Sequence, residues 1–185
     1  MLKDILIKSP EQKILSLFAM NPGRPFYVRE VAKRLRISVG AAHTALVGLE
    51  KGKLLDFERL GKTKLYRLRS PNPTVDLFKV LNTLVDLDPL IESLKDAARR
   101  IILFGSYATG TFGASSDLDL FIVSGKKSEV LVKIDAFKRK TGLDIRPLIK
   151  DQVEWRKLEK SNPEFSDELV RGITLWEKPV DESGF

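Results

Sequence analysis

The chain has 185 residues, a hydrophobic content of 43%, no cysteine and a formal net charge of +7. This length allows two small domains or one medium one, the hydrophobic content favours a globular fold, and the lack of cysteine excludes disulfides and thiolate metal sites. With no basic-then-apolar leader and no apolar run near 18 residues, we expect a cytoplasmic protein with no membrane partner.

The positive charge is concentrated in the N-terminal part of the chain. Residues 1–69 carry 15 Lys and Arg against 6 Asp and Glu, whereas residues 70–185 carry 17 against 19. This asymmetry predicts a basic module followed by one with a different use, and nucleic acid is the first partner it indicates. A solvated basic surface without a nucleic-acid partner is the alternative.

The sequence up to residue 69 predicts three helices and then a β-hairpin. Ser9, Pro10 and Gln12 form a helix start with a capping box, and Asn21-Pro22-Gly23 ends that helix. The remaining elements, read from apolar spacing and turn residues, are a short strand at 26–28, helices over 29–35 and 39–51, and strands over 54–60 and 64–69.

This order of elements resembles the winged helix-turn-helix family over residues 9–69. The resemblance implies that the third helix enters the major groove of DNA and that the hairpin contacts the DNA backbone. The residues expected to bind DNA are Ser38, His43, Thr44, Arg59, Lys62 and Lys64. The third helix lacks the Arg, Asn and Gln side chains that usually read bases, so dimerisation or partner docking through this domain is the alternative.

A second series of elements follows the linker Ser70-Pro71-Asn72-Pro73. Apolar patterning and cap residues predict helices over 74–85, 88–98, 106–110, 127–140, 150–160 and 163–171, and strands over 99–104, 118–123, 143–149 and 173–176. The strand over 99–104 has the continuous apolar run of a strand covered on both faces.

Three aspartates and a small-residue turn carry the chemistry. Asp117 and Asp119 are two residues apart at a predicted strand, so their side chains share one face, and Asp144 lies between apolar residues in another strand. Paired carboxylates repel each other unless a cation lies between them, and hard oxygen ligands suit Mg²⁺ or Mn²⁺. The Gly105-Ser106 turn opens a helix whose backbone N–H groups can meet a phosphate.

The Gly-Ser turn, the ten residues that separate it from Asp117-Leu118-Asp119, and the later Asp144 resemble the polymerase-beta-type nucleotidyltransferase superfamily. The small size of the domain resembles its minimal branch, which includes antitoxins that modify a paired helical toxin. The resemblance implies transfer of a nucleoside monophosphate from a nucleoside triphosphate, with ATP expected, to an acceptor that the sequence does not identify.

The same resemblance assigns roles to individual residues. Asp117, Asp119 and Asp144 would be the catalytic residues and hold Mg²⁺ or Mn²⁺, while Gly105 and Ser106 would bind the triphosphate. Arg146 shares the face of Asp144 and would contact phosphate or neutralise the cluster. The minimal branch often has a basic residue soon after the Gly-Ser pair, where this chain has Tyr107-Ala108-Thr109. Triphosphate binding is therefore expected to depend on the metals and Arg146.

We therefore expect an α+β chain with two domains. A winged helix domain spans residues 1–70, and a small mixed-sheet nucleotidyltransferase domain with flanking helices spans residues 71–185. Two other functions are open: a transcriptional regulator whose second domain senses nucleotide without turnover, and an antitoxin-like protein that binds a helical protein partner. A homodimer is compatible with either, because winged helix regulators commonly pair across palindromic sites.

Overall fold

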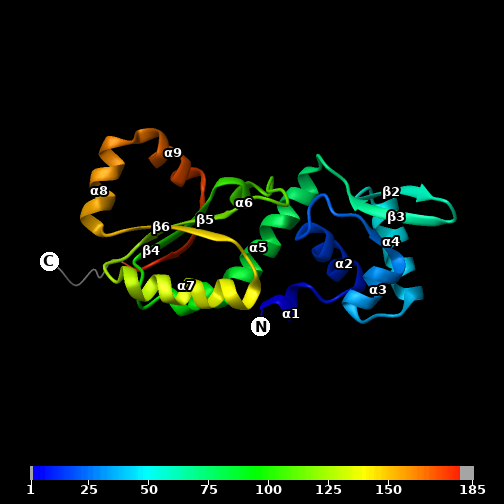
Figure 1. Cartoon of the computed structure of the whole chain (residues 1–185). Coiled ribbons are helices and arrows are strands. Elements are labelled where there is room, and N and C mark those ends of the chain that lie inside the picture. The colour runs from blue at the N-terminus through cyan, green and yellow to red at the C-terminus, as the bar shows by residue number, and fades with distance from the viewer. Residues whose placement is uncertain (1, 180–185) are drawn as a thin grey trace. The chain divides into compact units, whose positions relative to one another are not determined.

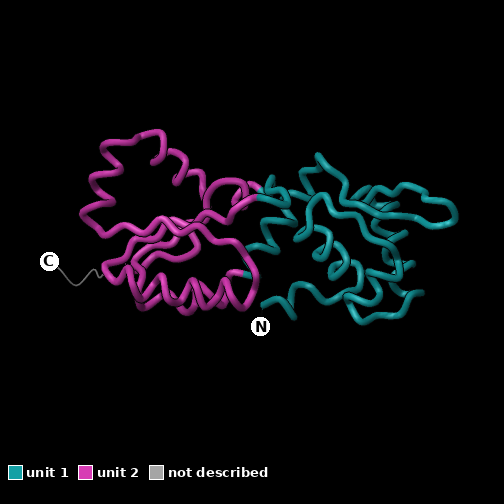
Figure 2. The backbone as a smooth tube through the Cα atoms, viewed as in Figure 1, with its two compact units in different colours: residues 1–86, 110–115 teal, residues 87–109, 116–185 magenta. Residues whose placement is uncertain are grey.

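The computed structural model describes residues 2–179, so Met1 and residues 180–185, which the expected domains include, lie outside the described residues. The chain divides into two compact units (Figures 1 and 2). Unit 1 comprises residues 1–86 and 110–115, and unit 2 comprises residues 87–109 and 116–185. The short segment 110–115 therefore belongs to unit 1 although the chain on both sides of it belongs to unit 2.

Unit 1 has the element order that the sequence predicts, with an additional short helix at its start. Its elements are α1 (Leu2–Leu6), α2 (Pro10–Ala19), β1 (Phe26–Tyr27), α3 (Val28–Leu35), α4 (Val39–Lys51), β2 (Leu55–Leu60) and β3 (Thr63–Leu68). The three strands form an antiparallel sheet in the order β1-β3-β2. The helices α2, α3 and α4 pack together and against this sheet.

Local sequence signals fix the ends of these helices. The Ser9 side chain accepts a hydrogen bond from the Gln12 backbone N–H, and the Gln12 side chain accepts one from the Ser9 backbone N–H, so the predicted capping box is confirmed. Ser38 caps α4 by accepting from the Ala41 backbone N–H. Behind these caps lies a core whose fully buried members include Ile14, Phe18, Phe26, Leu46, Leu55 and Tyr66.

One helix replaces the two that the sequence predicts after the linker. The structure has a continuous α5 (Pro73–Leu94) with Pro89 in its interior, so the predicted break near residues 86–88 is wrong. Proline removes one helical hydrogen bond and normally ends or kinks a helix. Leu87, Leu90 and Leu94 are all buried, so apolar burial on both sides of Pro89 outweighs the local cost of the proline.

Unit 2 is built around a four-stranded mixed sheet. Its strands are β4 (Arg100–Phe104), β5 (Leu118–Val123), β6 (Ile145–Lys150) and β7 (Ile173–Glu177), in the order β6-β5-β4-β7. Strands β5 and β6 are parallel, and the other two pairs are antiparallel. The predicted strands are confirmed, but β6 begins at residue 145 rather than 143, so Asp117 and Asp144 lie immediately before their strands.

Helices cover both faces of this sheet. They are α6 (Gly105–Thr109), α7 (Lys127–Thr141), α8 (Gln152–Ser161) and α9 (Pro163–Arg171), and Figure 1 shows α7 on one face and α8 with α9 on the other. On the α8 and α9 face, the buried residues Ile102, Phe121, Val123 and Leu169 form one cluster. The Phe121 ring contacts Trp155 of α8, with ring centroids 4.7 Å apart.

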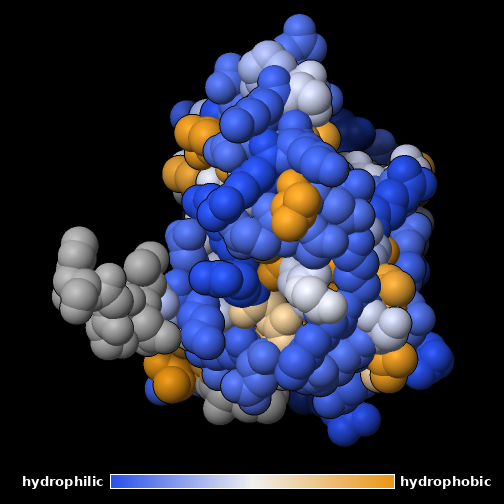
Figure 3. Space-filling view, turned by 90° about the vertical axis from the view of Figure 1, so that its left-hand side faces the viewer, coloured by the Kyte–Doolittle hydropathy of each residue, from blue (hydrophilic) through white to orange (hydrophobic). Residues whose placement is uncertain are grey.

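The surface of unit 2 seen in Figure 3 is mostly hydrophilic, with hydrophobic side chains scattered rather than gathered in one patch. Scattered apolar exposure is ordinary for a folded domain. Across residues 2–179, no helix has both the length and the apolar character needed to cross a membrane.

Leu169 and Val170 are neighbours on α9 and provide a matched test of this packing. Leu169 is 3% exposed and Val170 is 82% exposed. Leu169→Ala should lower the free energy of unfolding by about 2–5 kcal/mol because it leaves a cavity in the cluster, whereas Val170→Ala should change it by less than about 0.5 kcal/mol. Urea denaturation of both variants measures the difference, and equal effects would contradict the described position of α9.

Candidate functional site

The site is formed where β4 ends and β5 and β6 begin. The antiparallel register pairs Phe104 with Asp119, which places the turn at Gly105 beside the start of β5. The parallel register pairs Leu118 with Ile145, and the Leu118 backbone N–H donates to the Asp144 carbonyl oxygen over 2.8 Å. The pairing of three strands therefore brings Gly105, Asp117, Asp119 and Asp144 to one end of the sheet.

Gly105 is required by the close approach of its backbone to Asp119. Its φ is +69°, a conformation that favours glycine, and a Cβ at this position would lie 2.9 Å from Oδ2 of Asp119. Gly105 also opens α6, the short helix that the sequence predicts, and Ser106 lies half-buried in its first turn. A glycine at this turn leaves room for Asp119 that any larger residue would take.

Asp117 forms an ion pair with the arginine that the sequence places on the same face. Nη1 of Arg146 lies 2.8 Å from Oδ2 of Asp117, and the Asp117 side chain is only 21% exposed. The expectation that Arg146 neutralises the carboxylate cluster agrees with this contact. Most of the Arg146 side chain is open to solvent.

Asp144 is the exposed member of the cluster. A hydrogen bond with the Asp117 carboxyl holds the pKa of Asp144 below its ordinary value, and the Lys138 ammonium and the Arg146 charge lower it further. Nζ of Lys138 lies 3.4 Å from Oδ1 of Asp144. These contacts favour the ionised form of Asp144 at neutral pH.

Asp119 has the opposite electrostatic environment. Burial raises the pKa of its carboxyl above the ordinary value, and the negative charges of Asp117 and Glu168 raise it further, while Arg146 opposes them. The ionised form of Asp119 is therefore disfavoured by its surroundings. A cation bound between Asp117 and Asp119 would relieve this repulsion.

The donor chemistry at this site fits a hard divalent cation, because carboxylate oxygens are the ligands that Mg²⁺ and Mn²⁺ prefer. Within the part of the chain that the structure describes, however, no three Asp, Glu or His side chains are arranged to hold one ion. Asp117 pairs with Arg146 in this arrangement. Holding a metal with all three aspartates would require Asp117 to give up that pair.

Three residues near the carboxylates received no definite role from the sequence. Lys138 lies in the last turn of α7 beside Asp144, and the charge of Glu168 on α9 raises the pKa of Asp119. Tyr107 is 8% exposed, and burial raises the pKa of its hydroxyl, with Asp117 and Asp144 adding to the effect. Lys138 and Glu168 carry no sequence signal, because their position depends on how α7 and α9 pack.

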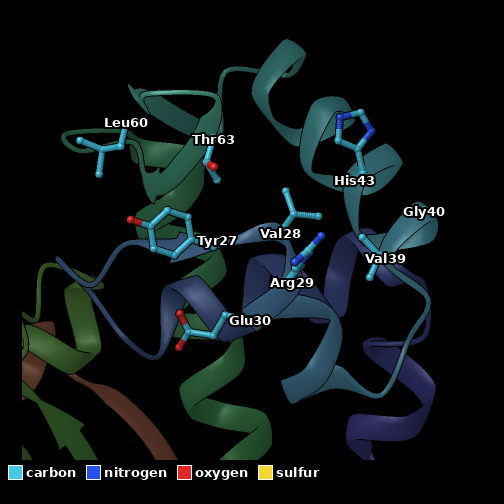
Figure 4. Close-up of a pocket in the computed structure, with 9 residues that line it drawn as sticks. All are labelled: Tyr27, Val28, Arg29, Glu30, Val39, Gly40, His43, Leu60 and Thr63. Carbon is cyan, nitrogen blue, oxygen red and sulfur yellow. The ribbon is translucent and has the colours of Figure 1, made fainter.

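In unit 1, α3, α4 and the tip of the hairpin border an open cavity with a volume of about 850 Å³ (Figure 4). Val39, Gly40 and His43 approach it from α4, and Leu60 and Thr63 approach it from the hairpin. An adjoining cavity of about 390 Å³ is bordered by His43, Arg59 and Lys62. Of the residues expected to bind DNA, His43 of α4 thus lies next to Arg59 and Lys62 of the hairpin.

The other residues expected to bind DNA are placed differently. Thr44 is exposed on α4, and the Ser38 hydroxyl is used to cap that helix. Nζ of Lys64 lies 2.9 Å from a Glu50 carboxylate oxygen and 3.6 Å from the centre of the Phe57 ring. Lys64 is therefore engaged within unit 1, whereas Arg59 and Lys62 are exposed.

The environment of Asp119 predicts a stabilising substitution. Because the folded state raises this pKa, ionisation of Asp119 costs stability as pH rises from below 3.8 through the raised value, and the cost persists at pH 7. In metal-free buffer, Asp119→Asn should therefore unfold at a higher temperature than the wild type at pH 7, and the gain should disappear below pH 3.8. Asp135→Asn, at an exposed position on α7, is the control. Thermal melts across this pH range measure the effect, and a destabilised Asp119→Asn at pH 7 would contradict the described site.

Comparison with known proteins finds a similarity in the second half of the chain. Residues 87–174 match the family model described as a nucleotidyltransferase domain. No curated protein matches the chain.

Several solved structures are similar to parts of the chain. Reduced HlyU from Vibrio cholerae is 23% identical, with 45% of this chain and 83% of that chain covered at a TM-score of 0.36. AF1382 from Archaeoglobus fulgidus is 18% identical, with 48% and 97% covered at 0.41. A protein from Sulfolobus solfataricus that has been assigned as a nucleotidyltransferase is 18% identical, with 63% and 97% covered at 0.39.

Each of these TM-scores is below 0.5, so we infer nothing about this chain from the three structures. The family match spans β4, β5 and β6 together with the Gly105 turn and all three aspartates. Residues 87–174 are therefore similar to a nucleotidyltransferase domain over the segment that contains the candidate site.

Proposed function

We propose that the chain transfers a nucleoside monophosphate from a nucleoside triphosphate, with ATP expected, to an acceptor, with Mg²⁺ or Mn²⁺ bound at Asp117, Asp119 and Asp144. The observation that carries the proposal is the register of β4, β5 and β6, which brings the Gly105 turn and the three carboxylates to one end of the sheet. The segment that matches the nucleotidyltransferase family model contains all of these residues.

The chain's own residues would divide the work of binding. Gly105 and Ser106 would bind the terminal phosphates through backbone N–H groups and the Ser106 hydroxyl. Arg146 would release Asp117 and carry its positive charge to the triphosphate, for which its largely exposed side chain has the freedom. This role compensates for the missing basic residue after Ser106.

The carboxylates would supply negative charge at fixed positions. The bound cations would neutralise the α-phosphate and the departing pyrophosphate. The pairing of Phe104 with Asp119 places the Asp119 carboxylate close to the Gly105 turn, so its position is set before substrate binds. Asp144 would complete the carboxylate set, and its ionised side chain would add negative charge for the cation on the acceptor side.

Substitution of Asp117 tests the proposed activity. Wild-type protein should release pyrophosphate from a nucleoside triphosphate in the presence of Mg²⁺ and not in EDTA. Asp117→Asn should lower the rate by at least about 100-fold, because it removes charge stabilisation from the reaction centre. Asp135→Asn, whose side chain is exposed on α7, should keep the wild-type rate.

In a second experiment, a triphosphate labelled at its α-phosphate identifies the acceptor, because the label is transferred to the chain itself, to added DNA or to a host protein. No release by wild type, or equal rates in wild type and Asp117→Asn, would refute the proposal.

A second function, DNA binding by unit 1 as a winged helix domain, is favoured by the arrangement at the hairpin tip. Helices α3 and α4 are followed by a two-stranded hairpin, and exposed Arg59 and Lys62 lie at its tip near His43. Phosphate contacts from such residues give affinity without base selection. If unit 1 binds DNA, the chain would be a transcriptional regulator or an antitoxin-like protein with a helical protein partner. A homodimer of the chain would match a palindromic DNA site.

The salt dependence of DNA binding distinguishes this function from partner docking. Wild-type affinity for duplex DNA, measured by fluorescence anisotropy, should fall steeply with salt concentration. Replacing both Arg59 and Lys62 by Ala should reduce the slope of log K against log salt by about 2, since each lost phosphate contact reduces it by about 1. Lys140→Ala, at an exposed site on α7, should leave the slope unchanged. Absence of binding at low salt would favour partner docking instead.

A further inference from the structure

The loop between the two halves of the catalytic motif is held by unit 1. Residues 110–115 lie within the ten residues that separate Ser106 from Asp117, and they belong to unit 1 (Figure 2). Gly110 is four residues after Ser106, and Ser115 is two residues before Asp117. The conformation of this loop therefore constrains where both of these residues can lie.

A buried lysine on α5 holds the centre of the loop. Lys79 is 5% exposed, and its Nζ donates to the Phe112 carbonyl oxygen over 2.6 Å. The same ammonium lies 4.1 Å from the centre of the Phe112 ring, which is itself 2% exposed. Lysine is rarely buried this far, because removing its charge from water is costly unless hydrogen bonds and ring contacts offset the cost.

A second contact fixes the start of the loop. Gly110 has φ of +76°, and a Cβ at this position would lie 2.0 Å from the Asp76 carbonyl oxygen on α5. The loop backbone thus lies directly against α5 at Gly110, and Lys79 holds it one helical turn further along at Phe112. Beside these contacts, α5 and residues 111–114 border a cavity of about 520 Å³, so the loop is not enclosed by packing on that side.

We propose that Lys79 is a positioning residue for the nucleotidyltransferase site, holding loop 110–115 so that Ser106 and Asp117 keep their spacing. This inference rests on the proposed function. Lys79 does not itself touch substrate or metal; it acts through the Phe112 carbonyl group and the chain on either side.

The experiment compares Lys79→Met, Lys79→Arg and Lys13→Met. Methionine keeps the apolar stem and removes the donor, arginine keeps charge and donor, and Lys13 is an exposed control on α2. The first readout is hydrogen exchange of the peptide covering residues 107–117 in protein without nucleotide or metal. Lys79→Met should exchange at least about 10-fold faster than wild type in this peptide, Lys79→Arg should restore most of the protection, and Lys13→Met should match wild type.

The second readout is the kinetics of pyrophosphate release with Mg²⁺ and a nucleoside triphosphate. Lys79→Met should lower kcat/KM by about 10- to 100-fold with a raised KM, because the phosphate-binding turn and Asp117 lose their spacing. A role in overall folding alone would lower the active fraction, and so kcat, without raising KM. Should Lys79→Met fail to fold, Phe112→Leu, which removes the ring contact and keeps the backbone carbonyl, takes its place with the same expected directions.

The outcomes separate this inference from the proposed function. Unchanged exchange of residues 107–117 in Lys79→Met overturns the inference whatever the activity. Faster exchange with unchanged kcat and KM in an active enzyme also overturns it. A wild type that releases no pyrophosphate overturns the proposed function, and the positioning role falls with it, while the exchange data still decide whether Lys79 anchors the loop.

Discussion

The pairing of β5 with both β4 and β6 is the constraint on which the site depends. Antiparallel pairing with β4 places the Gly105 turn against the Asp119 carboxylate, and parallel pairing with β6 places Asp144 beside Asp117. A slip of one residue in either ladder would turn the side chains to the opposite face of the sheet. The apolar residues on both sides of the sheet oppose such a slip, so the same burial that stabilises the domain aligns its functional groups.

Bringing the three carboxylates together creates electrostatic repulsion that the neighbouring cationic side chains only partly offset. Asp119 is disfavoured as an anion by burial and by two neighbouring carboxylates, while Asp117 is paired with Arg146 and Asp144 interacts with Lys138. A structural cluster would be expected to pair every carboxylate. Within the described residues, Asp119 has no cationic partner of its own, whereas Asp117 and Asp144 pair with Arg146 and Lys138. Such perturbed carboxylates are common at functional sites, which supports the proposed binding of a cation and an anionic substrate.

The sequence predicts those parts of the fold that depend on local interactions. The cap at Ser9 sets the start of α2, and the strand over residues 99–104 follows from its continuous apolar run. The prediction failed at Pro89, where burial of distant contacts overrides a local helix breaker. Lys138, Glu168 and the anchoring of residues 110–115 by Lys79 could not be predicted, because each depends on which elements pack together in three dimensions. Asp117 and Asp119 are predicted from their spacing and Asp144 from its apolar neighbours, and the structure brings all three to one end of the sheet.

A crystal structure of the protein with Mn²⁺ and a triphosphate that cannot be cleaved between its α- and β-phosphates would test the proposed site most directly. We expect anomalous density for Mn²⁺ bound by Asp117 and Asp119, with Asp144 as a further ligand, and phosphates at Gly105 and Ser106. We also expect Arg146 to leave Asp117 and approach the triphosphate. Mn²⁺ and nucleotide bound elsewhere, with the 2.8 Å pair between Arg146 and Asp117 intact, would contradict the proposed site.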